Sequence, residues 1–561
     1  MNNKDRFIIY ENDNEFIYDK KNNHIQIKFN RVAFIFFIFF MISVIYSIHL
    51  AHLGSRNSSD INKIQTLNYN KLKRLDIIDR NGNFLAKTVS SIDIGINPSE
   101  IIDQKKLLLN LGYIFPKLDS QLIKTKIEKN KFFWLEKKIS DENYEKIMML
   151  GDKSIKPEEK LTRVYPQKNL FSHIIGQIDN DNNGISGLEK SLDNKLKNKN
   201  KDSIQLTVDK DIQFLIREEL LKYNQIFRAK GSAAILMNVN NGEIISLVSI
   251  PDFDPNKRSN ITDINYINRA TKGVYELGSV FKTFTLAAGF HEGIIEPHTE
   301  FNNLEKKLKC GKNTIGEYDD KIPSDLTAEK ILIRSGNIGS VRIGQAIGID
   351  KFKKFMNNLD LIHPIKFDIE ETGIPIPFKW GKCKLATTSY GHGITTTILQ
   401  LANAYSVITN GGYKIYPTLI KKDNYRKQKK ILNNEVSKKI NPILRKIVTS
   451  KEGTASLANI EGYEVGGKTG TAQKSVDGKY SKSKVNTFAS IFPSSNPKYT
   501  LVVMLDEPKT NNEYIYHLKD GSGLKYKGTP FNTAGWTSVE VVGQIIEKIG
   551  PILATKYNQV Y

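Results

Sequence analysis

An apolar segment near the start of the sequence constrains the fold more than any other feature. Residues 32–51 contain no Asp, Glu, Lys or Arg, and about 20 such residues are the length that a helix needs to cross a bilayer. In lipid, a single segment satisfies its own backbone hydrogen bonds only as a helix. We therefore expect a membrane-spanning helix at 32–51.

The flanks of this segment indicate an anchor that is retained. A cleaved signal peptide has a shorter apolar core and a small-residue cleavage site, and residues 49–55 lack that pattern. No cysteine directly follows the segment, which excludes processing as a lipoprotein. Four cations lie in the twenty residues before it and three in the twenty after it, so the charge balance favours a cytoplasmic N-terminus. We expect residues 1–31 to be a cytoplasmic tail without regular structure.

The composition is that of a globular protein with an excess of basic residues. The 561 residues are 39% hydrophobic and 25% charged, which is ordinary usage for two or three folded domains. The formal net charge of +22 would suit an anionic partner. The cations are scattered without interleaved aromatic residues, so we expect no nucleic-acid partner. Cys310 and Cys383 have no metal-ligand spacing, and the sequence leaves open whether they pair.

After the anchor, the chain divides into two segments of different pattern. Residues 52–230 contain short predicted strands and turns, with a hairpin at 75–86 around Asn81-Gly82. From 231 onward the pattern is that of a compact domain, which we place at 231–545 with a tail at 546–561. Its predicted elements are a hairpin at 232–248, mainly helical sequence at 327–408, and strands at 465–473, 486–492 and 499–505.

Ser279 and Lys282 form a candidate catalytic pair. The sequence predicts a helix that starts at Ser279, because serine is favoured at a helix N-terminus and an apolar side follows it. Residues three apart on a helix are neighbours, so the Lys282 amine would lie within reach of the Ser279 hydroxyl. A lysine kept neutral by burial or by another cation can act as the base that activates a serine. Taken alone, the pattern also fits a capped helix with a solvated lysine.

Two further motifs follow downstream. Ser335-Gly336-Asn337 lies 56 positions after Ser279, and Lys468-Thr469-Gly470 lies 133 positions after Ser335. Ser-x-x-Lys, Ser-x-Asn and Lys-Thr-Gly in this order are the signature of penicillin-binding proteins and serine β-lactamases. Each motif alone fits a turn or a flexible loop, but the three together indicate an active-site serine.

With these motifs the chain resembles the class B penicillin-binding proteins, and within them the cell-division (septal, FtsI-type) peptidoglycan D,D-transpeptidases. The resemblance covers nearly the whole chain after the anchor. It implies an α+β protein with a single transmembrane helix, a strand-rich pedestal (dimerisation-type) domain, and a transpeptidase domain in which helices flank an antiparallel sheet. The segments that carry it are 79–82, 163–166, 184–189, 242–244, 251–256, 268–270, 389–393, 399–402 and 467–474.

The resemblance also implies a mechanism. Ser279 would attack the carbonyl between the last two D-alanines of a stem peptide, with Lys282 as its base, and D-alanine would leave as an acyl-enzyme forms. Ser335 and Asn337 would complete the proton relay and hold the substrate amide. Lys468 would add positive charge that keeps Lys282 neutral. The amine of a neighbouring stem peptide would then attack the ester, and a crosslink would result.

Substrate binding is assigned to the third motif in the same way. The backbone N–H groups of Ser279 and Thr471 would form the oxyanion hole. The Thr469-Gly470-Thr471 segment would bind the terminal carboxylate through its hydroxyls. Because penicillin mimics D-Ala-D-Ala, β-lactams should acylate Ser279. No cofactor and no metal is expected.

Some residues depart from the family pattern. Leu277 stands where a proline usually precedes Gly-Ser, Asn238 where an aspartate is common, and Ile398 where a proline is usual. Residues 532–536 match the family's Gly-Gly stretch only loosely. None of these belongs to the expected catalytic set. They leave the choice of the septal over the elongation subtype resting mainly on residues 389–393.

Other functions remain open. A D,D-carboxypeptidase or β-lactamase would use the same serine and release the acyl group to water, although the pedestal, the anchor and the lack of an obvious deacylating glutamate argue against a β-lactamase. A penicillin sensor or scaffold would be expected to have lost one of the three motifs, and all three are present.

The resemblance finally implies partners and a location. The expected partners are peptidoglycan stem peptides ending in D-Ala-D-Ala, β-lactams, a membrane glycan polymerase of the SEDS class (FtsW type), and other division proteins. The expected location is the inner membrane, crossed once, with the catalytic domain in the periplasm at the division site.

Overall fold

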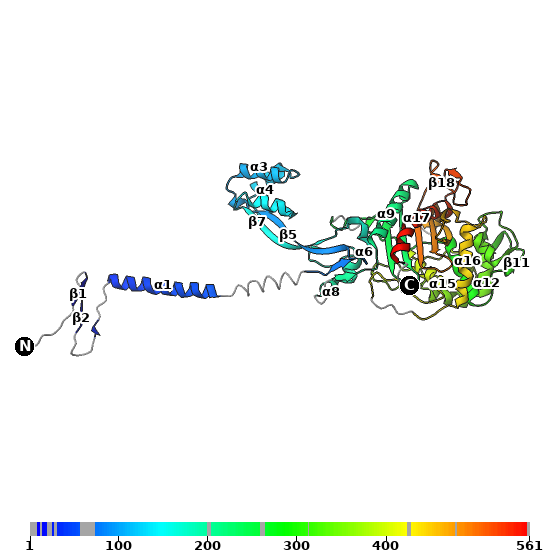
Figure 1. Cartoon of the computed structure of the whole chain (residues 1–561), viewed down its shortest axis with the longest axis horizontal. Helices are drawn as coiled ribbons and strands as arrows, with labels where there is room; N and C mark the ends of the chain where they lie inside the picture. Colours follow the sequence, from blue (N-terminus) through cyan, green and yellow to red (C-terminus); the bar gives the residue numbers. More distant parts are fainter. Residues whose placement is uncertain are drawn as a thin grey trace, which may run out of the picture. The chain divides into compact units, whose positions relative to one another are not determined.

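The computed structural model of the chain (Figure 1) describes residues 8–11, 14–18, 25–26, 31–55, 73–198, 203–257, 264–311, 313–422, 428–476 and 479–557. The chain separates into two compact units, residues 1–72 and 73–561, which are described here one at a time.

The first unit contains the expected anchor helix. Helix α1 spans Arg31–Ser55, and its segment Ala33–His52 is long and apolar enough to cross a membrane. Its large apolar side chains are exposed, Phe36 by 72%, which suits contact with lipid. Upstream, β1 (Ile8–Glu11), β2 (Asn14–Tyr18) and β3 (Ile25–Gln26) form a small antiparallel sheet. The expectation of a tail without regular structure is therefore wrong for these three strands.

The second unit begins with the pedestal. Its sheet has the order β6-β5-β4-β8, with β7 paired to β5. The predicted hairpin at 75–86 is confirmed: β4 and β5 pair antiparallel around Gly82, which has a φ of +87°, a value that favours glycine. The strands are β4 (Asp76–Ile78), β5 (Phe84–Ile96), β6 (Phe133–Ile139), β7 (Ile155–Val164) and β8 (Ser203–Gln205).

The pedestal has two separate apolar regions. Where β5 meets β6 and β7, the sheet packs with three helices around Ile94, Leu111 and Ile147, which are fully buried. Figure 1 shows α3 and α4 at this end of β5 and β7. These helices are α3 (Gln104–Ile114), α4 (Ser120–Glu128) and α5 (Asp141–Met148), and the pedestal's remaining short helices are α6 (Ser172–Ile175), α7 (Gly187–Ser191) and α8 (Asp193–Leu196).

A buried ion-pair cluster holds the base of the pedestal together. The Glu189 carboxylate accepts hydrogen bonds from Arg74 Nε at 2.9 Å and Arg163 Nε at 2.7 Å, and all three side chains are excluded from solvent. The apolar residues around this base belong to the same core as the C-terminal domain. The base is thus continuous with the domain that it supports.

The C-terminal domain is built on one antiparallel sheet of order β10-β9-β17-β16-β15. The predicted hairpin at 232–248 and the three later strands are confirmed, as is the α+β fold class. The strands are β9 (Gly231–Asn238), β10 (Ile244–Ile250), β15 (Gly466–Val476), β16 (Lys479–Phe492) and β17 (Tyr499–Asp506). Strand β15, which carries the Lys-Thr-Gly motif, is an edge strand.

Helices cover both faces of this sheet. Figure 1 shows α9 and α17 on one side of it and α15 and α16 on the other. The predicted helical stretch at 327–408 is a series of shorter helices with a non-helical segment at 360–381. The helices are α9 (Lys210–Ile226), α10 (Lys282–His291), α11 (Ala328–Ile333), α12 (Asn337–Ile347), α13 (Ile349–Asn358), α14 (Lys382–Ser389), α15 (Ile398–Thr409), α16 (Asn434–Thr449) and α17 (Ser538–Tyr557).

The ends of the C-terminal domain differ from the sequence-based expectation. The segment predicted as a tail after 545 is the second half of α17, and its Ile546, Ile549 and Leu553 are buried in the core. Their helical spacing places them on one apolar face, which packs on β16 and β17. Helix α9, assigned to the pedestal by a boundary at 230, packs against β9, β10 and α17 and is part of the same layer.

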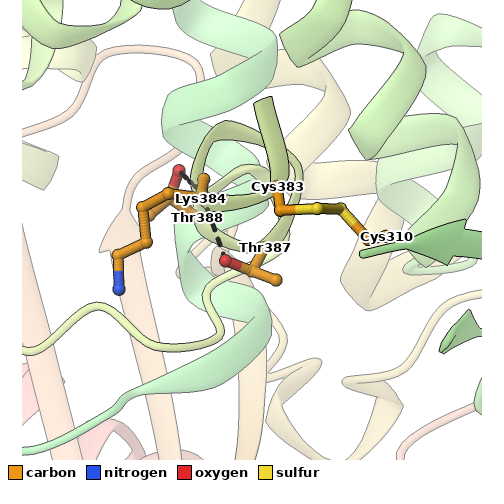
Figure 2. The surroundings of a disulfide bond; sticks show 5 residues. All are labelled: Cys310, Cys383, Lys384, Thr387 and Thr388. Atoms are coloured by element: carbon orange, nitrogen blue, oxygen red, sulfur yellow. Dashed lines mark hydrogen bonds between the residues drawn. A yellow bond between two sulfur atoms is a disulfide. The ribbon is translucent and has the colours of Figure 1, made fainter. Parts of the chain in front are cut away.

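A disulfide joins two peripheral segments of this domain (Figure 2). Cys310 ends β12 (Lys307–Cys310), which pairs with β13 (Asn313–Gly316), and Cys383 lies in α14. Their Cα atoms are 5.4 Å apart, across a sequence separation of 73. The pairing that the sequence left open is therefore present. The remaining short strands are β11 (Glu300–Phe301), β14 (Leu326–Thr327), β18 (Ile515–His517) and β19 (Lys525–Lys527).

Removal of this disulfide should destabilise the C-terminal domain. A crosslink over a loop of this length typically stabilises a fold by about 2–4 kcal/mol. We expect the Cys310→Ser/Cys383→Ser variant of the full-length chain in detergent to show a lower thermal midpoint by differential scanning fluorimetry. Dithiothreitol should lower the midpoint of the parent chain and leave that of the double variant unchanged. Equal midpoints for the parent and the double variant would contradict the expectation.

Candidate active site

The three sequence motifs meet at one cavity of about 610 Å³ in the C-terminal domain. Several segments far apart in the sequence line it, among them the 3₁₀ turn before α10, the turn between α11 and α12, the edge strand β15, and the loop after α14. The predicted site residues that line the cavity are Ser279, Ser335, Asn337, Thr469 and Thr471. Lys282 and Lys468 are buried, with exposures of 1% and 0%.

Ser279 lies in a 3₁₀ turn, Gly278–Phe281, and α10 begins only at Lys282. The prediction that the helix starts at Ser279 is therefore wrong by one turn, and the serine side chain does not cap the helix. Gly278 has a φ of +63°, and a Cβ atom there would lie 2.8 Å from the carbonyl oxygen of Thr471. The tight turn thus presses against β15 and holds the partly exposed serine at the cavity wall.

The lysines of the first and third motifs converge on the serine of the second. Lys282 Nζ lies 3.1 Å from Ser335 Oγ, and Lys468 Nζ lies 2.9 Å from the same oxygen. Lys282 also donates to the Ser335 carbonyl, and Lys468 to the carbonyl of Thr469 at 3.1 Å. One hydroxyl therefore links both amines beside Ser279.

Burial changes the protonation of both amines, because charge is disfavoured away from water. It lowers the pKa of Lys282 to about 7, against the weaker opposing pull of Glu317. Burial, and then the nearby Lys282, hold the pKa of Lys468 well below its usual range. An amine with a pKa of about 7 is available in its neutral form near neutral pH, as a base must be.

The second motif is held in place by a residue that sequence reasoning missed. Glu317 accepts hydrogen bonds from the backbone N–H groups of Asn337 at 2.7 Å and Ile338 at 2.8 Å, at the start of α12. A carboxylate is favoured there because the first N–H groups of a helix have no partner within the helix. The Asn337 side chain donates to the carbonyl of Gly316 at 2.8 Å. Ser335 has a φ of +59°, an uncommon conformation for serine.

The third motif approaches the Ser279 turn through its backbone. A Cβ atom at Gly470 would lie 2.1 Å from the carbonyl oxygen of Leu277, so no other residue fits between the strand and the turn. Gly391, with a φ of +87°, makes a similar approach, since a Cβ atom there would lie 1.9 Å from the carbonyl oxygen of Gly278. These close approaches of Gly470 and Gly391 to the Ser279 turn bring the backbone of Ser279 and the backbone of Thr471 to the same part of the cavity.

The threonines of this motif make contacts that the sequence did not indicate. Thr469 Oγ1 lies 2.8 Å from Thr454 Oγ1, and Thr471 Oγ1 accepts a hydrogen bond from the N–H of Ala534 at 2.9 Å. Thr454 and Trp536 also line the cavity. Thr454 belongs to no motif found in the sequence, and Trp536 belongs to the 532–536 segment, which matches the family pattern only loosely. Within the residues that the structure describes, no group of three or more His, Cys, Asp or Glu residues could hold a metal ion.

The loop after α14 completes the cavity. Tyr390, Gly391 and His392 line it, and the sequence had linked this segment to the family without a chemical role. Overall the cavity combines an accessible serine, two buried amines and a close approach of two backbone segments, which is an arrangement for acyl transfer.

Comparison with known proteins agrees with this geometry. Residues 232–521 match the family described as "Penicillin binding protein transpeptidase domain", and residues 70–219 match "Penicillin-binding Protein dimerisation domain". A relative from Caulobacter vibrioides, named "Probable peptidoglycan D,D-transpeptidase FtsI", is 31% identical over 86% of this chain and 82% of its own length.

Two other similar proteins extend the comparison. "Peptidoglycan D,D-transpeptidase FtsI" of Buchnera aphidicola is 30% identical over 79% of this chain and 84% of its own length. A crystal structure from Atopobium parvulum, described as that of a "putative peptidoglycan glycosyltransferase", has a TM-score of 0.63 at 22% identity, and the match covers 87% of this chain and 98% of that one. The last likeness concerns the fold alone. On these matches the chain belongs to the penicillin-binding protein transpeptidases, and within them to the FtsI-type proteins of class B.

Proposed function

We propose that this D,D-transpeptidase crosslinks peptidoglycan stem peptides during septal wall synthesis, through an acyl-enzyme on Ser279. The observation that carries the proposal is the convergence of Lys282 and Lys468 on Ser335 beside that serine. A serine hydroxyl is a weak nucleophile near neutral pH and needs a base close by. The buried Lys282 amine, one helical turn after Ser279, supplies it.

The first half of the reaction forms the acyl-enzyme. Neutral Lys282 takes the proton of Ser279 as the serine oxygen attacks the carbonyl between the two terminal D-alanines. Ser335, hydrogen-bonded to both amines, passes a proton to the leaving amine, and D-alanine departs. Asn337 holds the substrate amide at the cavity wall. The roles of Ser279 and Asn337 are supported by their position in the cavity lining. Those of Lys282 and Ser335 are supported by the hydrogen bonds that join Ser335 to Lys282 and Lys468.

The oxyanion hole consists of the N–H groups of Ser279 and Thr471. The close approach of Gly470 to the Ser279 turn supports this assignment. Donors placed in advance at the developing charge are effective because they need no reorganisation during reaction. The terminal carboxylate of the substrate binds to the hydroxyls of Thr469 and Thr471, and the positive charge of the Lys282–Lys468 pair attracts it. A β-lactam binds in the same part of the cavity.

The septal role and the location rest on different observations. Two relatives carry the name FtsI, and α1 supplies a helix able to anchor the chain. The Cys310–Cys383 disulfide supports a catalytic domain outside the cytoplasm, since disulfides persist in oxidising compartments. The SEDS-class polymerase and other division proteins remain expectations from resemblance. A D,D-carboxypeptidase would share the first half-reaction and differ only in the acceptor, water in place of an amine.

Labelling with a fluorescent penicillin tests the acyl-enzyme. We expect a stable adduct on Ser279 of the full-length chain in detergent, identified by mass spectrometry of the labelled peptide, and no adduct on the Ser279→Ala variant. Ser522→Ala, at an exposed serine outside the cavity, is the matched control and should label like the parent. Folded parent protein without an adduct would rule out the proposed chemistry, and rapid loss of the label would favour a hydrolase.

The pH dependence of acylation should report Lys282. Only the neutral amine is a base, so the acylation rate constant for a β-lactam should rise about tenfold per pH unit below the Lys282 pKa of about 7 and level off above it. Stopped-flow measurement between pH 5.5 and 8.5 provides the profile. A flat profile across this range would argue against Lys282 as the base.

Gly470→Ala should damage the oxyanion hole without removing a catalytic side chain. The added Cβ atom would meet the Leu277 carbonyl at 2.1 Å, so the strand and the turn must separate. Loss of one oxyanion donor typically costs about 10²–10³ in rate, and we expect β-lactam acylation to slow by that order. Gly112→Ala is the control, because a Cβ atom at Gly112 has open space. Acylation by the Gly470 variant within about threefold of the parent would contradict the assignment.

A further inference from the structure

A second group of polar side chains, which has no part in forming the acyl-enzyme, reaches the cavity through Tyr390 and His392. The His392 ring is stacked on Tyr390 at 5.8 Å and lies 4.7 Å from the ring of Tyr480. Its Nδ1 atom is 3.9 Å from Oε2 of Glu276. The His392 side chain is 42% exposed, whereas that of Glu276 is 15% exposed. The group thus presents an accessible imidazole backed by a largely covered carboxylate.

Hydrogen bonds fix the Glu276 carboxylate. It accepts from the N–H of Gly393 at 3.0 Å and from the hydroxyl of Tyr480 at 3.2 Å. Tyr480 is the second residue of β16, and Gly393 lies on the loop after α14. A carboxylate held by two elements in this way lies 3.9 Å from His392 Nδ1 and can stabilise the imidazole when it becomes charged.

This group lies next to the nucleophile. Glu276 precedes Ser279 by three residues in the chain, and Tyr275 pairs with Thr396 on the far side of the same loop. Gly391, the neighbour of His392, packs on the carbonyl of Gly278, the neighbour of Ser279. His392 and Ser279 both line the cavity. A molecule that attacks an acyl group on Ser279 therefore has His392 within the same space.

The second half of transpeptidation needs a base that the first half does not. The acceptor is an amine, and an aliphatic amine is protonated near neutral pH, since its pKa resembles that of lysine, about 10.4. An ammonium group has no lone pair for attack. The proton relay around Ser335 returns one proton to Ser279 when the ester bond breaks, so the extra proton of the ammonium must leave by another route.

We propose that His392 is the base that deprotonates the acceptor amine, and that Glu276 positions it; the proposal rests on the acyl-enzyme function proposed above. The ammonium gives one proton to the His392 imidazole. The neutral amine then attacks the ester carbonyl, the new C–N bond forms, and the bond from that carbon to Ser279 Oγ breaks. The second amine proton passes through Lys282 and Ser335 to Ser279. Imidazolium, paired with Glu276, releases its proton to solvent.

The charges around His392 agree with this role. Burial lowers the pKa of His392, the Glu276 carboxylate raises it, and the Lys384 cation lowers it. The titratable groups around it are Glu276, Lys384, Tyr390 and Tyr480. Lys384 donates to the carbonyl of Gly393 and lies over the ring of Phe378. A net lowered pKa keeps the imidazole neutral, and therefore able to accept a proton, near neutral pH.

The ratio of aminolysis to hydrolysis of one acyl-enzyme tests the proposal, because this ratio does not depend on how fast the acyl-enzyme forms. The full-length chain in detergent is acylated by a thiolester donor that ends in a D-alanyl carbonyl, with D-alanine as the acceptor amine. Removing a general base typically costs about 10²–10⁴ in rate. We expect His392→Gln to lower the ratio of aminolysis to hydrolysis at least tenfold. His298→Gln, at an exposed histidine outside the cavity, is the matched control and should keep the parent ratio.

Two further measurements separate a base from a merely structural residue. Hydroxylamine is largely unprotonated at neutral pH, so as the acceptor it should restore aminolysis by the His392→Gln variant. Glu276→Gln keeps the hydrogen bonds but removes the charge that raises the His392 pKa, so the rising limb of aminolysis against pH should move to lower pH.

The outcomes also separate this proposal from the function on which it rests. An unchanged partition ratio in the His392 variant, or an equal loss with hydroxylamine and with D-alanine, would overturn the role of His392 and leave the acyl-enzyme in place. Failure of the parent enzyme to form any acyl-enzyme would overturn the proposed function, and this inference with it.

Discussion

The burial of two lysine amines around one serine hydroxyl is the constraint on which the site depends. A buried amine is costly unless its hydrogen bonds are satisfied, and here Ser335 accepts from both Lys282 and Lys468. The three residues come from α10, from the turn before α12 and from β15, so this one hydroxyl links helical layer and sheet. The same burial lowers the pKa of Lys282 to about 7. The exclusion of water from these amines is thus the cause both of the free-energy cost of burying them and of the lowered pKa of Lys282.

Close backbone packing is the second constraint, and it explains the glycines of the site. Gly470 and Gly391 both lie where a Cβ atom would strike a carbonyl of the Ser279 turn. Their approach from two directions leaves the turn little freedom. Such rigidity would suit the proposed role of Ser279, because a nucleophile and its oxyanion donors must keep their geometry as charge develops. The Glu317 carboxylate fixes the start of α12 through two backbone hydrogen bonds.

Two of the segments at the cavity are connected outside it. The β12–β13 hairpin leads into Glu317, and α14 leads into the loop that carries His392. The Cys310–Cys383 disulfide joins that hairpin to that helix. The segment that orients the second motif and the segment proposed to receive the acceptor amine are therefore tied together by a covalent bond.

The long apolar helix, the sheet strands and the three motifs could be predicted from the sequence, because apolar periodicity and motif order are local properties of the chain. The sequence also favoured Ser279 as nucleophile. Tertiary structure alone decided that Cys310 pairs with Cys383, that α17 continues to Tyr557, and that Ser279 lies in a 3₁₀ turn before α10. It also revealed the role of Glu317 and the proximity of Glu276 to His392, a residue of the 389–393 segment for which the sequence indicated no chemical role. These features depend on contacts between residues that are distant in the chain or on packing against the sheet, and no local pattern encodes such contacts.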